Sequence, residues 1–256
     1  MSNVLLALTT LTAIRFPILK NCIPGRSVRY FPLAGVLIGG IFWALYYALS
    51  YASYVPGLHL PELTAFIILV LYAFLTGGLH FDGLADWADA HFAGKDKTRT
   101  LEILKDTHMG AFGVVALIIL LLGKWILYKT WILNGSFALI FISFVVSRLG
   151  ASYACAMYSS VRKNGTGTEF IEKAKPTDFI IALTLALLAG FAAAGIVGLG
   201  LIVLSMILIP LVAVYISNKI GGMTGDLLGA QIELTELLFL LLTLFIPFEN
   251  IFIWLG

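Results

Sequence analysis

Three aspartates, Asp82, Asp86 and Asp89, lie within eight positions, directly after the apolar run LTAFIILVLYAFLT. On a helix their i, i+4, i+7 spacing projects all three from one face, with neighbours roughly 5 to 6 Å apart. Like charges at that distance repel by about 3 kcal/mol per pair at an effective dielectric of about 20. A cation between them would relieve this repulsion, and hard oxygen donors suit Mg²⁺ or Mn²⁺ better than Zn²⁺. We therefore predict a metal site at these three aspartates; the alternative is a solvated acidic loop.

The segment LEILKDTHMGAFG (101–113) places a lysine, an aspartate and a histidine close together. Lys105 and His108 could meet phosphate oxygens, while Asp106 could join the metal or act as a general base. The structural alternative is a polar cluster at the entry to a helix. The segment by itself does not decide between these interpretations.

Arg148 stands inside the apolar stretch FISFVVSRLGASYA. A cation within a membrane span costs about 2.5 to 3.5 kcal/mol on insertion scales unless it faces a polar cavity or an anion. We expect its partner to be either a substrate phosphate or one of the aspartates.

Two further segments carry polar groups beside glycines. In 220–236, Gly225 allows close backbone approach, Thr224 offers a hydroxyl, and Asp226 stands at an expected helix start. These residues could bind a substrate, or Thr224 or Asp226 could simply cap the helix. The basic loop RKNGTGTEF (162–170) could cover phosphates, although it lacks the spacing of a P-loop.

The elements that must position these residues are membrane helices. The 256 residues are 60% hydrophobic and 12% charged, roughly half the charged fraction of a soluble domain. This composition predicts an all-α, polytopic membrane helix bundle, formed by residues 1–256 as a single domain. A net charge of +2 excludes a nucleic-acid partner. Cys22 and Cys155 support neither a disulfide framework nor a cysteine metal site.

Apolar runs long enough to cross a bilayer predict about seven spans. The glycines Gly195, Gly198 and Gly200 indicate a tight turn that separates the fifth span from the sixth. The short run Val4 to Ile14 predicts an interfacial or re-entrant helix. The seven predicted spans are about 31–53, 62–79, 111–130, 136–157, 178–195, 198–217 and 234–254.

Lysines and arginines orient the spans, because cytoplasmic loops carry the excess of positive charge. The basic segments before the first span and after the second, fourth and sixth all fall on one side, which we predict to be cytoplasmic. Lys124 and Lys129 are assigned to the opposite side, at the end of the third span. The active-site segments are then about 80–110, 158–177 and 218–233, all facing the cytoplasm from the cell membrane.

Five strings of this sequence together resemble one enzyme family. They are YFPLAGVLIGG, TGGLHFDGLADWADA, LEILKDTHMGAFG, VVSRLGA and GGMTGDLLGAQIELTELLFLL, in that order. The chain resembles the cobalamin 5′-phosphate synthases, also called adenosylcobinamide-GDP ribazoletransferases, over most of its length. The sequence departs from the family pattern at two places. His108 stands where an arginine is common, and the stretch NGTGTEF (164–170) replaces a more Gly/Leu-like one.

The resemblance implies a Mg²⁺-dependent membrane enzyme of late cobalamin biosynthesis. Its members join adenosylcobinamide-GDP to α-ribazole or α-ribazole 5′-phosphate and release GMP. The resemblance places the metal on Asp82, Asp86 and Asp89. It implies catalytic roles for Asp89, Asp106 and Lys105, with Asp89 or Asp106 as the base. It also implies a set of substrate contacts at His80, Arg148, Thr224, Gly225 and Asp226.

Three alternatives remain open from the sequence. The CDP-alcohol phosphotransferases also use an acidic membrane helix, but their pattern begins Asp-Gly-x-x-Ala-Arg and adds a later pair of aspartates. This chain reads Asp82-Gly83-Leu84-Ala85-Asp86, with no such arginine or distal pair. A divalent-cation transporter needs carboxylates within the membrane, and a purely structural membrane protein does not explain polar motifs on one side. The pair Gly35 and Gly39 would permit close helix packing within the chain or in a homo-oligomer.

Overall fold

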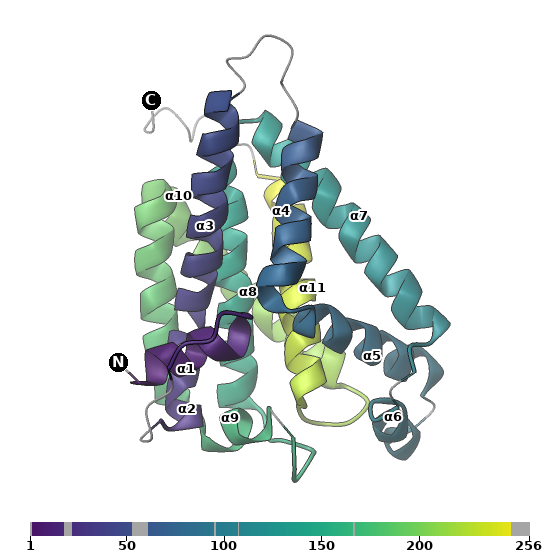
Figure 1. Cartoon of the computed structure of the whole chain (residues 1–256). Helices are drawn as coiled ribbons and strands as arrows, with labels where there is room; N and C mark the ends of the chain where they lie inside the picture. The colour runs from purple at the N-terminus through teal and green to yellow at the C-terminus, as the bar shows by residue number, and fades with distance from the viewer. Residues whose placement is uncertain are drawn as a thin grey trace.

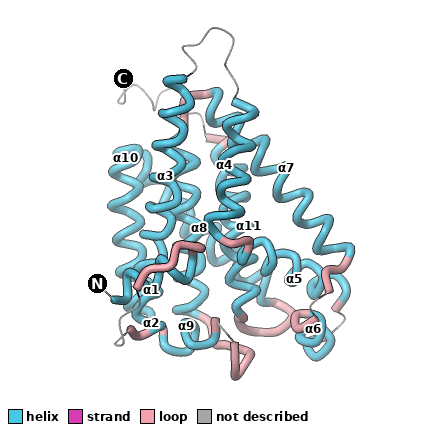
Figure 2. Tube along the Cα trace, viewed as in Figure 1, coloured by secondary structure: helices cyan, strands magenta, loops and turns pink. Residues whose placement is uncertain are grey.

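The protein was analysed as a computed structural model, which describes residues 2–17, 22–52, 61–94, 96–106, 108–165 and 167–246. Within these ranges the chain is helical, and its only strand-like feature is an isolated bridge between Ser160 and Met223. Figure 2 shows helices joined by loops throughout. The all-α prediction is confirmed.

The helices follow the apolar runs of the sequence closely (Figure 1). Helix α8 is the centre of the bundle, because nearly all of its side chains are buried against α3, α10 and α11. The elements are α1 (Ser2–Leu11), α2 (Pro24–Ser27), η1 (Val28–Tyr30), α3 (Phe31–Ala52), α4 (Pro61–Thr76), α5 (Leu79–Ala93), α6 (Lys97–Ile103), α7 (Ala111–Leu133), α8 (Phe137–Met157), α9 (Thr168–Lys173), α10 (Pro176–Ser217) and α11 (Gly225–Thr243).

Four helical runs of the described chain are long and apolar enough to cross a membrane: Pro24–Tyr51, α7, α8 and α10. The pair α4 and α5 passes the same test only together, with a bend of 89° between them. The count of about seven spans stays a prediction.

The long helix α10 folds back on itself at the predicted turn. Ala194 and Gly195 leave the helical conformation, and Gly195 has a φ of 56°. A Cβ added at Gly198 would collide with the backbone of Gly190. In an unbroken helix these two residues would stand about 12 Å apart along the axis. The segments on either side of Gly195 therefore pack against each other as two arms.

The glycine pair of α3 packs inside the chain. A side chain at Gly35 would meet the backbone of Phe144, and one at Gly39 would meet the ring of Phe141, 2.7 Å away. Both contacts belong to α8, so close packing of α3 on α8 accounts for Gly35 and Gly39 without a second copy of the protein.

One predicted boundary is wrong, and another lies inside a helix. Helix α7 runs to Leu133, so Lys124 lies inside the helix and is fully buried instead of ending a span beside a loop. Helix α11 begins at Gly225, next to the helix start expected at Asp226, so the last predicted span, about 234–254, covers only the second half of this helix. Its first half carries acidic residues that a hydropathy pattern assigns to a loop. Residues 247–254 of the predicted last span lie outside the described residues.

Candidate active site

A sharp turn sets the direction of the acidic helix. Gly77 and Gly78 have φ angles of 62° and 71°, a conformation that glycine adopts without steric cost. The turn sends α5 away from α4 at 89°, so that α5 crosses the lower end of the bundle in Figure 1 instead of continuing through it. We therefore place α5 outside the membrane-spanning segments.

Two glycines let α5 approach the first turns of α11. A Cβ on Gly83 would lie 2.5 Å from the backbone oxygen of Asp226, and one on Gly229 would lie 3.2 Å from Cα of His80. This close approach places the start of the acidic face of α5 beside Asp226.

Substituting Gly83→Ala should therefore move α5 away from α11. Overpacking of this kind costs about 1 to 3 kcal/mol, and a displacement of about 1 Å at a site can lower turnover by about 10²-fold. We expect at least a tenfold loss of turnover and a lower midpoint of thermal unfolding. Gly40→Ala is the matched control, since a Cβ there would meet nothing within 4 Å. Equal effects of the two substitutions would contradict this packing.

The carboxylates of α5 and α11 share one electrostatic environment. Burial, together with the negative charges of Asp82, Asp226 and Asp89, raises the pKa of Asp86 to about 7, against an opposing effect of Arg162. Asp82 is exposed and Asp86 is half-buried. The cluster therefore holds more negative charge than its one nearby arginine balances.

Asp89 takes a different direction from the other two aspartates. It is 7% exposed, and its two carboxylate oxygens accept hydrogen bonds from the backbone amides of Gly110, at 2.7 Å, and Gly113, at 2.9 Å. These amides begin α7, and the first amides of a helix have no partner within it. Asp89 therefore caps α7, and any metal bound by Asp89 would compete with these two bonds.

The arrangement of these carboxylates limits how a metal ion could be held. No group of three His, Cys, Asp or Glu side chains in the described part of the chain is arranged to hold a metal ion. The acidic face alone therefore does not form a closed cage. Mg²⁺, however, usually takes one or two carboxylates and completes its shell with water and substrate phosphates. The unbalanced charge at Asp82 and Asp86 fits a metal held in that way.

Arg162 supplies the cation of the site, a role for which the sequence analysis considered Lys105 and Arg148 instead. Its Nη1 lies 2.8 Å from Oδ2 of Asp226, and its Nη2 donates to the carbonyl oxygen of Leu104 at 2.7 Å. The only advance signal was the basic loop that contains it. The pairing depends on contacts between segments far apart in the sequence.

Backbone contacts hold that loop against the start of α11. The amide of Val161 donates to the carbonyl of Met223 at 3.1 Å, and the amide of Met223 donates to the carbonyl of Ser159 at 3.0 Å. Gly167 lies so close to Gly225 that a Cβ there would be 2.7 Å from Cα of Gly225. Gly225 thus allows the backbone of the basic loop to approach the start of α11 closely, as its residue type indicated.

The remaining predicted residues are placed as follows. Thr224 is the N-cap of α11 and its hydroxyl accepts from the amide of Leu227, so the capping alternative is present. Lys105 and Asp106 are exposed and do not line the cavity described next. The hydrogen bonds from the ring and the amide of His108 hold the pKa of Asp106 below its usual range. Leu104, the residue before Lys105, is joined to Asp226 through Arg162, so the pair Lys105 and Asp106 follows directly on a residue of the site, without an ion pair from Lys105 to Asp82 or Asp226.

A cavity of about 430 Å³ opens beside the carboxylates, within the range of small-molecule sites. His80, Asp82 and Asp226 contribute its charged and titratable groups. His80 is 2% exposed, and neither of its ring nitrogens has a hydrogen-bond partner among the described residues. The other lining residues are Thr10, Leu11, Phe31, Leu79, Ala151, Gly167, Phe170, Gly225, Leu228, Gly229 and Ile232.

Comparison with known proteins gives one family. The family described as cobalamin-5-phosphate synthase matches residues 3–244 of this chain. The chain belongs to the cobalamin-5-phosphate synthase family.

Similar proteins are named adenosylcobinamide-GDP ribazoletransferase. One from Clostridium botulinum (strain Okra / Type B1) is 36% identical over 225 residues, covering 86% of this chain and 87% of that protein. One from Clostridium botulinum (strain Loch Maree / Type A3) is 35% identical over 237 residues, with 90% and 93% covered. One from Caldanaerobacter subterraneus subsp. tengcongensis is 34% identical over 215 residues, with 83% and 84% covered. No solved structure matches the chain.

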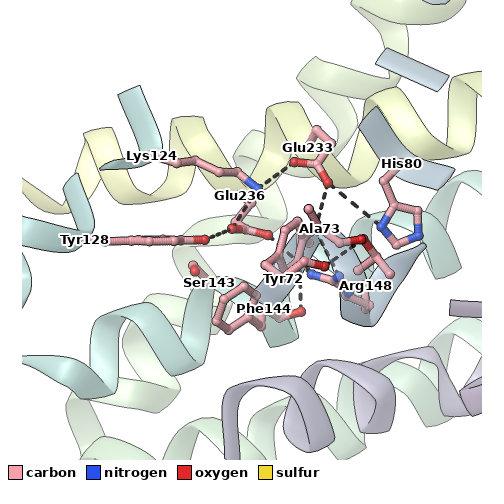
Figure 3. Close-up of polar contacts among 12 residues, drawn as sticks. Tyr72, Ala73, His80, Lys124, Tyr128, Ser143, Phe144, Arg148, Glu233 and Glu236 are labelled. Carbon is pink, nitrogen blue, oxygen red and sulfur yellow. Dashed lines mark hydrogen bonds and ion pairs between the residues drawn. The ribbon is translucent and has the colours of Figure 1, made fainter. Parts of the chain in front are cut away.

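This member of the cobalamin-5-phosphate synthase family also contains a buried charge network, drawn in Figure 3. Nζ of Lys124, on α7, lies 2.5 Å from Oε2 of Glu233 and 2.8 Å from Oε1 of Glu236, both on α11. Arg148, on α8, lies 3.3 Å from Oε2 of Glu236. All four side chains are fully buried. Two cations and two carboxylates therefore balance inside the bundle.

Two tyrosines complete this network. The hydroxyl of Tyr72 donates to Glu233 at 2.7 Å and accepts from Arg148 at 3.1 Å, while the hydroxyl of Tyr128 donates to Glu236 at 2.5 Å. Arg148 was expected to face a phosphate or an aspartate, and in the structure its partner is a glutamate. Helices α7 and α11 therefore also carry buried charges, at Lys124, Glu233 and Glu236.

Proposed function

We propose that this protein is an adenosylcobinamide-GDP ribazoletransferase. In the proposed reaction, a ribose hydroxyl of α-ribazole or α-ribazole 5′-phosphate attacks the phosphorus that is attached to cobinamide. A P–O bond of the diphosphate breaks, GMP leaves, and the hydroxyl loses its proton. The proposal draws on the names of the relatives. The matched region covers most of this chain and most of each relative.

One observation carries the proposal beyond those names: the carboxylates of Asp82, Asp86 and Asp226 gather beside a cavity, with Arg162 as the paired cation. A site for a diphosphate needs a divalent metal on such carboxylates, and Mg²⁺ held by Asp82 and Asp86 would neutralise phosphate charge and polarise phosphorus. The chain itself would position the reactants. Arg162 orients Asp226, and the cavity holds the attacking hydroxyl near the carboxylates.

We further propose that this end of the bundle faces the cytoplasm from the cell membrane. Helices α5, α6 and α9 and the start of α11 all lie at the lower end in Figure 1. The basic side chains Arg162, Lys173 and Lys219 belong to the same end. Excess positive charge is the usual mark of a cytoplasmic face.

Product formation by the detergent-purified protein tests the activity. The protein would receive adenosylcobinamide-GDP with α-ribazole or its 5′-phosphate, and GMP and the corrinoid product would be measured. We expect both products in equal amounts, and none from a CDP-alcohol donor with the same acceptors. Absence of product from folded protein with either acceptor would overturn the proposal.

The raised pKa of Asp86 predicts pH-dependent metal binding. Without metal, Asp86 is mostly protonated below about pH 7, and a metal ion must displace that proton because it binds the ionised carboxylate. The affinity for Mn²⁺, used in place of Mg²⁺, should therefore fall by up to about tenfold per pH unit below 7 and level off above it. Titration of Mn²⁺ at pH 6, 7 and 8 measures this. An affinity that is equal at the three pH values would contradict the prediction.

A further inference from the structure

The cavity beside Asp82 has two chemically different ends. Asp82 and Asp226, which interact electrostatically, form its polar end, and nearly all of the other lining residues are apolar. We propose that this cavity is the subsite of the nucleoside acceptor, with the base against the apolar wall and the ribose at the polar end. This inference rests on the proposed function, and it identifies the residues that select the base.

The apolar wall is suited to a flat aromatic ring. Phe31 of α3 and Phe170 of α9 lie with ring centroids 6.0 Å apart and planes inclined by 46°. Leu228 and Ile232 face the same cavity from α11. Aromatic rings gain from edge and offset contacts with other rings as well as from burial of their area. A planar base is therefore the part of the acceptor that this wall accommodates.

The same wall offers few groups that could recognise polar substituents on a base. Among the lining residues that the structure describes, Thr10 is the one polar side chain away from the polar end. Its hydroxyl already donates to the carbonyl of Leu6 at 2.7 Å. The hydroxyl oxygen can still accept a hydrogen bond, but no side chain of the wall is left to donate one, so the additional ring nitrogens of adenine would lose their hydrogen bonds to water on entering. The wall therefore selects a base without such groups, of the benzimidazole kind, over adenine.

His80 lies next to the polar end of the cavity but offers no hydrogen bond to a ligand there. Its ring is buried, lines the cavity, and leaves both nitrogens without a hydrogen-bond partner in the described chain. Its Nδ1 faces Oε1 of Glu233 at 3.8 Å, which is too long for a hydrogen bond (Figure 3). Buried polar groups in proteins are nearly always paired. Because protein atoms cover both nitrogens, a ligand in the cavity cannot reach them, and Asp82 and Asp226 are the groups left to meet the ribose hydroxyls.

The size of the cavity separates the two substrates. A volume of about 430 Å³ suits one small molecule. A ribonucleoside is of this size, whereas the donor carries a corrin ring, an adenosyl group and a nucleoside diphosphate. The donor can bring its diphosphate to Asp82 and Asp86, but its corrin ring must lie outside the cavity.

The test compares two acceptors and two variants. At saturating adenosylcobinamide-GDP, wild-type protein should use α-ribazole 5′-phosphate with a kcat/KM roughly tenfold or more above that of an α-linked adenine ribonucleotide. Phe170→Ala should raise KM for α-ribazole 5′-phosphate roughly tenfold and leave KM for the donor unchanged. Leu228→Asn, which adds hydrogen-bonding groups to the wall, should narrow the preference between the two bases. Phe74→Ala on α4, where the ring is 75% exposed, is the matched control and should change none of these values.

Binding without turnover separates the two proposals. Calorimetric titration of α-ribazole 5′-phosphate into wild-type, Phe170→Ala and Phe74→Ala protein should show a loss of affinity in Phe170→Ala alone. If wild-type protein forms product but Phe170→Ala keeps full acceptor affinity, or changes KM for the donor instead, the acceptor subsite lies elsewhere. If wild-type protein forms no product from either acceptor, it is the proposed function that fails.

Discussion

Asp82→Asn and Asp86→Asn should each lower kcat by about 10²- to 10³-fold, the size of effect seen when one group that stabilises transition-state charge is removed. Each substitution keeps the shape of the side chain and removes a negative charge from the cluster around Asp86. The fold should survive, because Asp82 is exposed and Asp86 half-buried. GMP release at saturating substrates and Mg²⁺ measures the loss.

Two comparisons make this result specific. Glu102→Gln removes a carboxylate from α6, where its partner Arg99 and Glu102 itself are both exposed, and it should leave kcat unchanged. Asp89→Asn weakens the cap of α7, so we expect a lower unfolding temperature from it in addition to any loss of turnover. Near-normal turnover in both Asp82→Asn and Asp86→Asn would refute a metal role for the acidic face.

Lys124→Met should lower the free energy of unfolding by about 3 to 5 kcal/mol, because removing one partner of a buried ion pair leaves the other charge uncompensated. In this variant Glu233 and Glu236, which are fully buried and both paired with Lys124, would keep a negative charge that Lys124 no longer neutralises. Unfolding of the detergent-solubilised protein, followed by circular dichroism, measures the change. Combining Lys124→Met with Glu233→Gln restores the balance of charge and should recover a large part of the loss.

The same helix provides the control. Lys129 pairs with Glu62 at 2.7 Å, but both side chains are partly exposed, and exposed pairs contribute little. Lys129→Met should therefore leave the unfolding midpoint almost unchanged. If Lys124→Met were as mild as Lys129→Met, or if the double variant were less stable than the sum of its single substitutions predicts, the buried network would not have the role assigned to it.

Local patterns predicted much of the fold. The apolar runs located α3, α4, α7, α8 and both arms of α10, and the positive-φ glycine Gly195 stands at the predicted turn. The aspartates lie on helix α5, as the interpretation of their i, i+4, i+7 spacing assumed. These features depend on residues close together in the sequence, which is why they could be inferred from it.

Long-range contacts could not be predicted in the same way. Lys124, Glu233 and Glu236 interrupt apolar patterns, and hydropathy alone does not show that they neutralise one another across two helices. The orientation of Asp89 depends on amides at 110 and 113, in a different helix. Arg162 meets Asp226 only because the bridge between Ser160 and Met223 joins two distant loops.

The central claim is that the carboxylates of α5 hold a divalent metal together with the diphosphate of the donor. Electron paramagnetic resonance of Mn²⁺ with purified protein tests it directly, with and without adenosylcobinamide-GDP. We expect the donor to tighten Mn²⁺ binding in wild-type protein, and the double variant Asp82→Asn/Asp86→Asn to lose that effect while Glu102→Gln keeps it. Equal Mn²⁺ binding by wild-type protein and the double variant in the presence of the donor would contradict the claim.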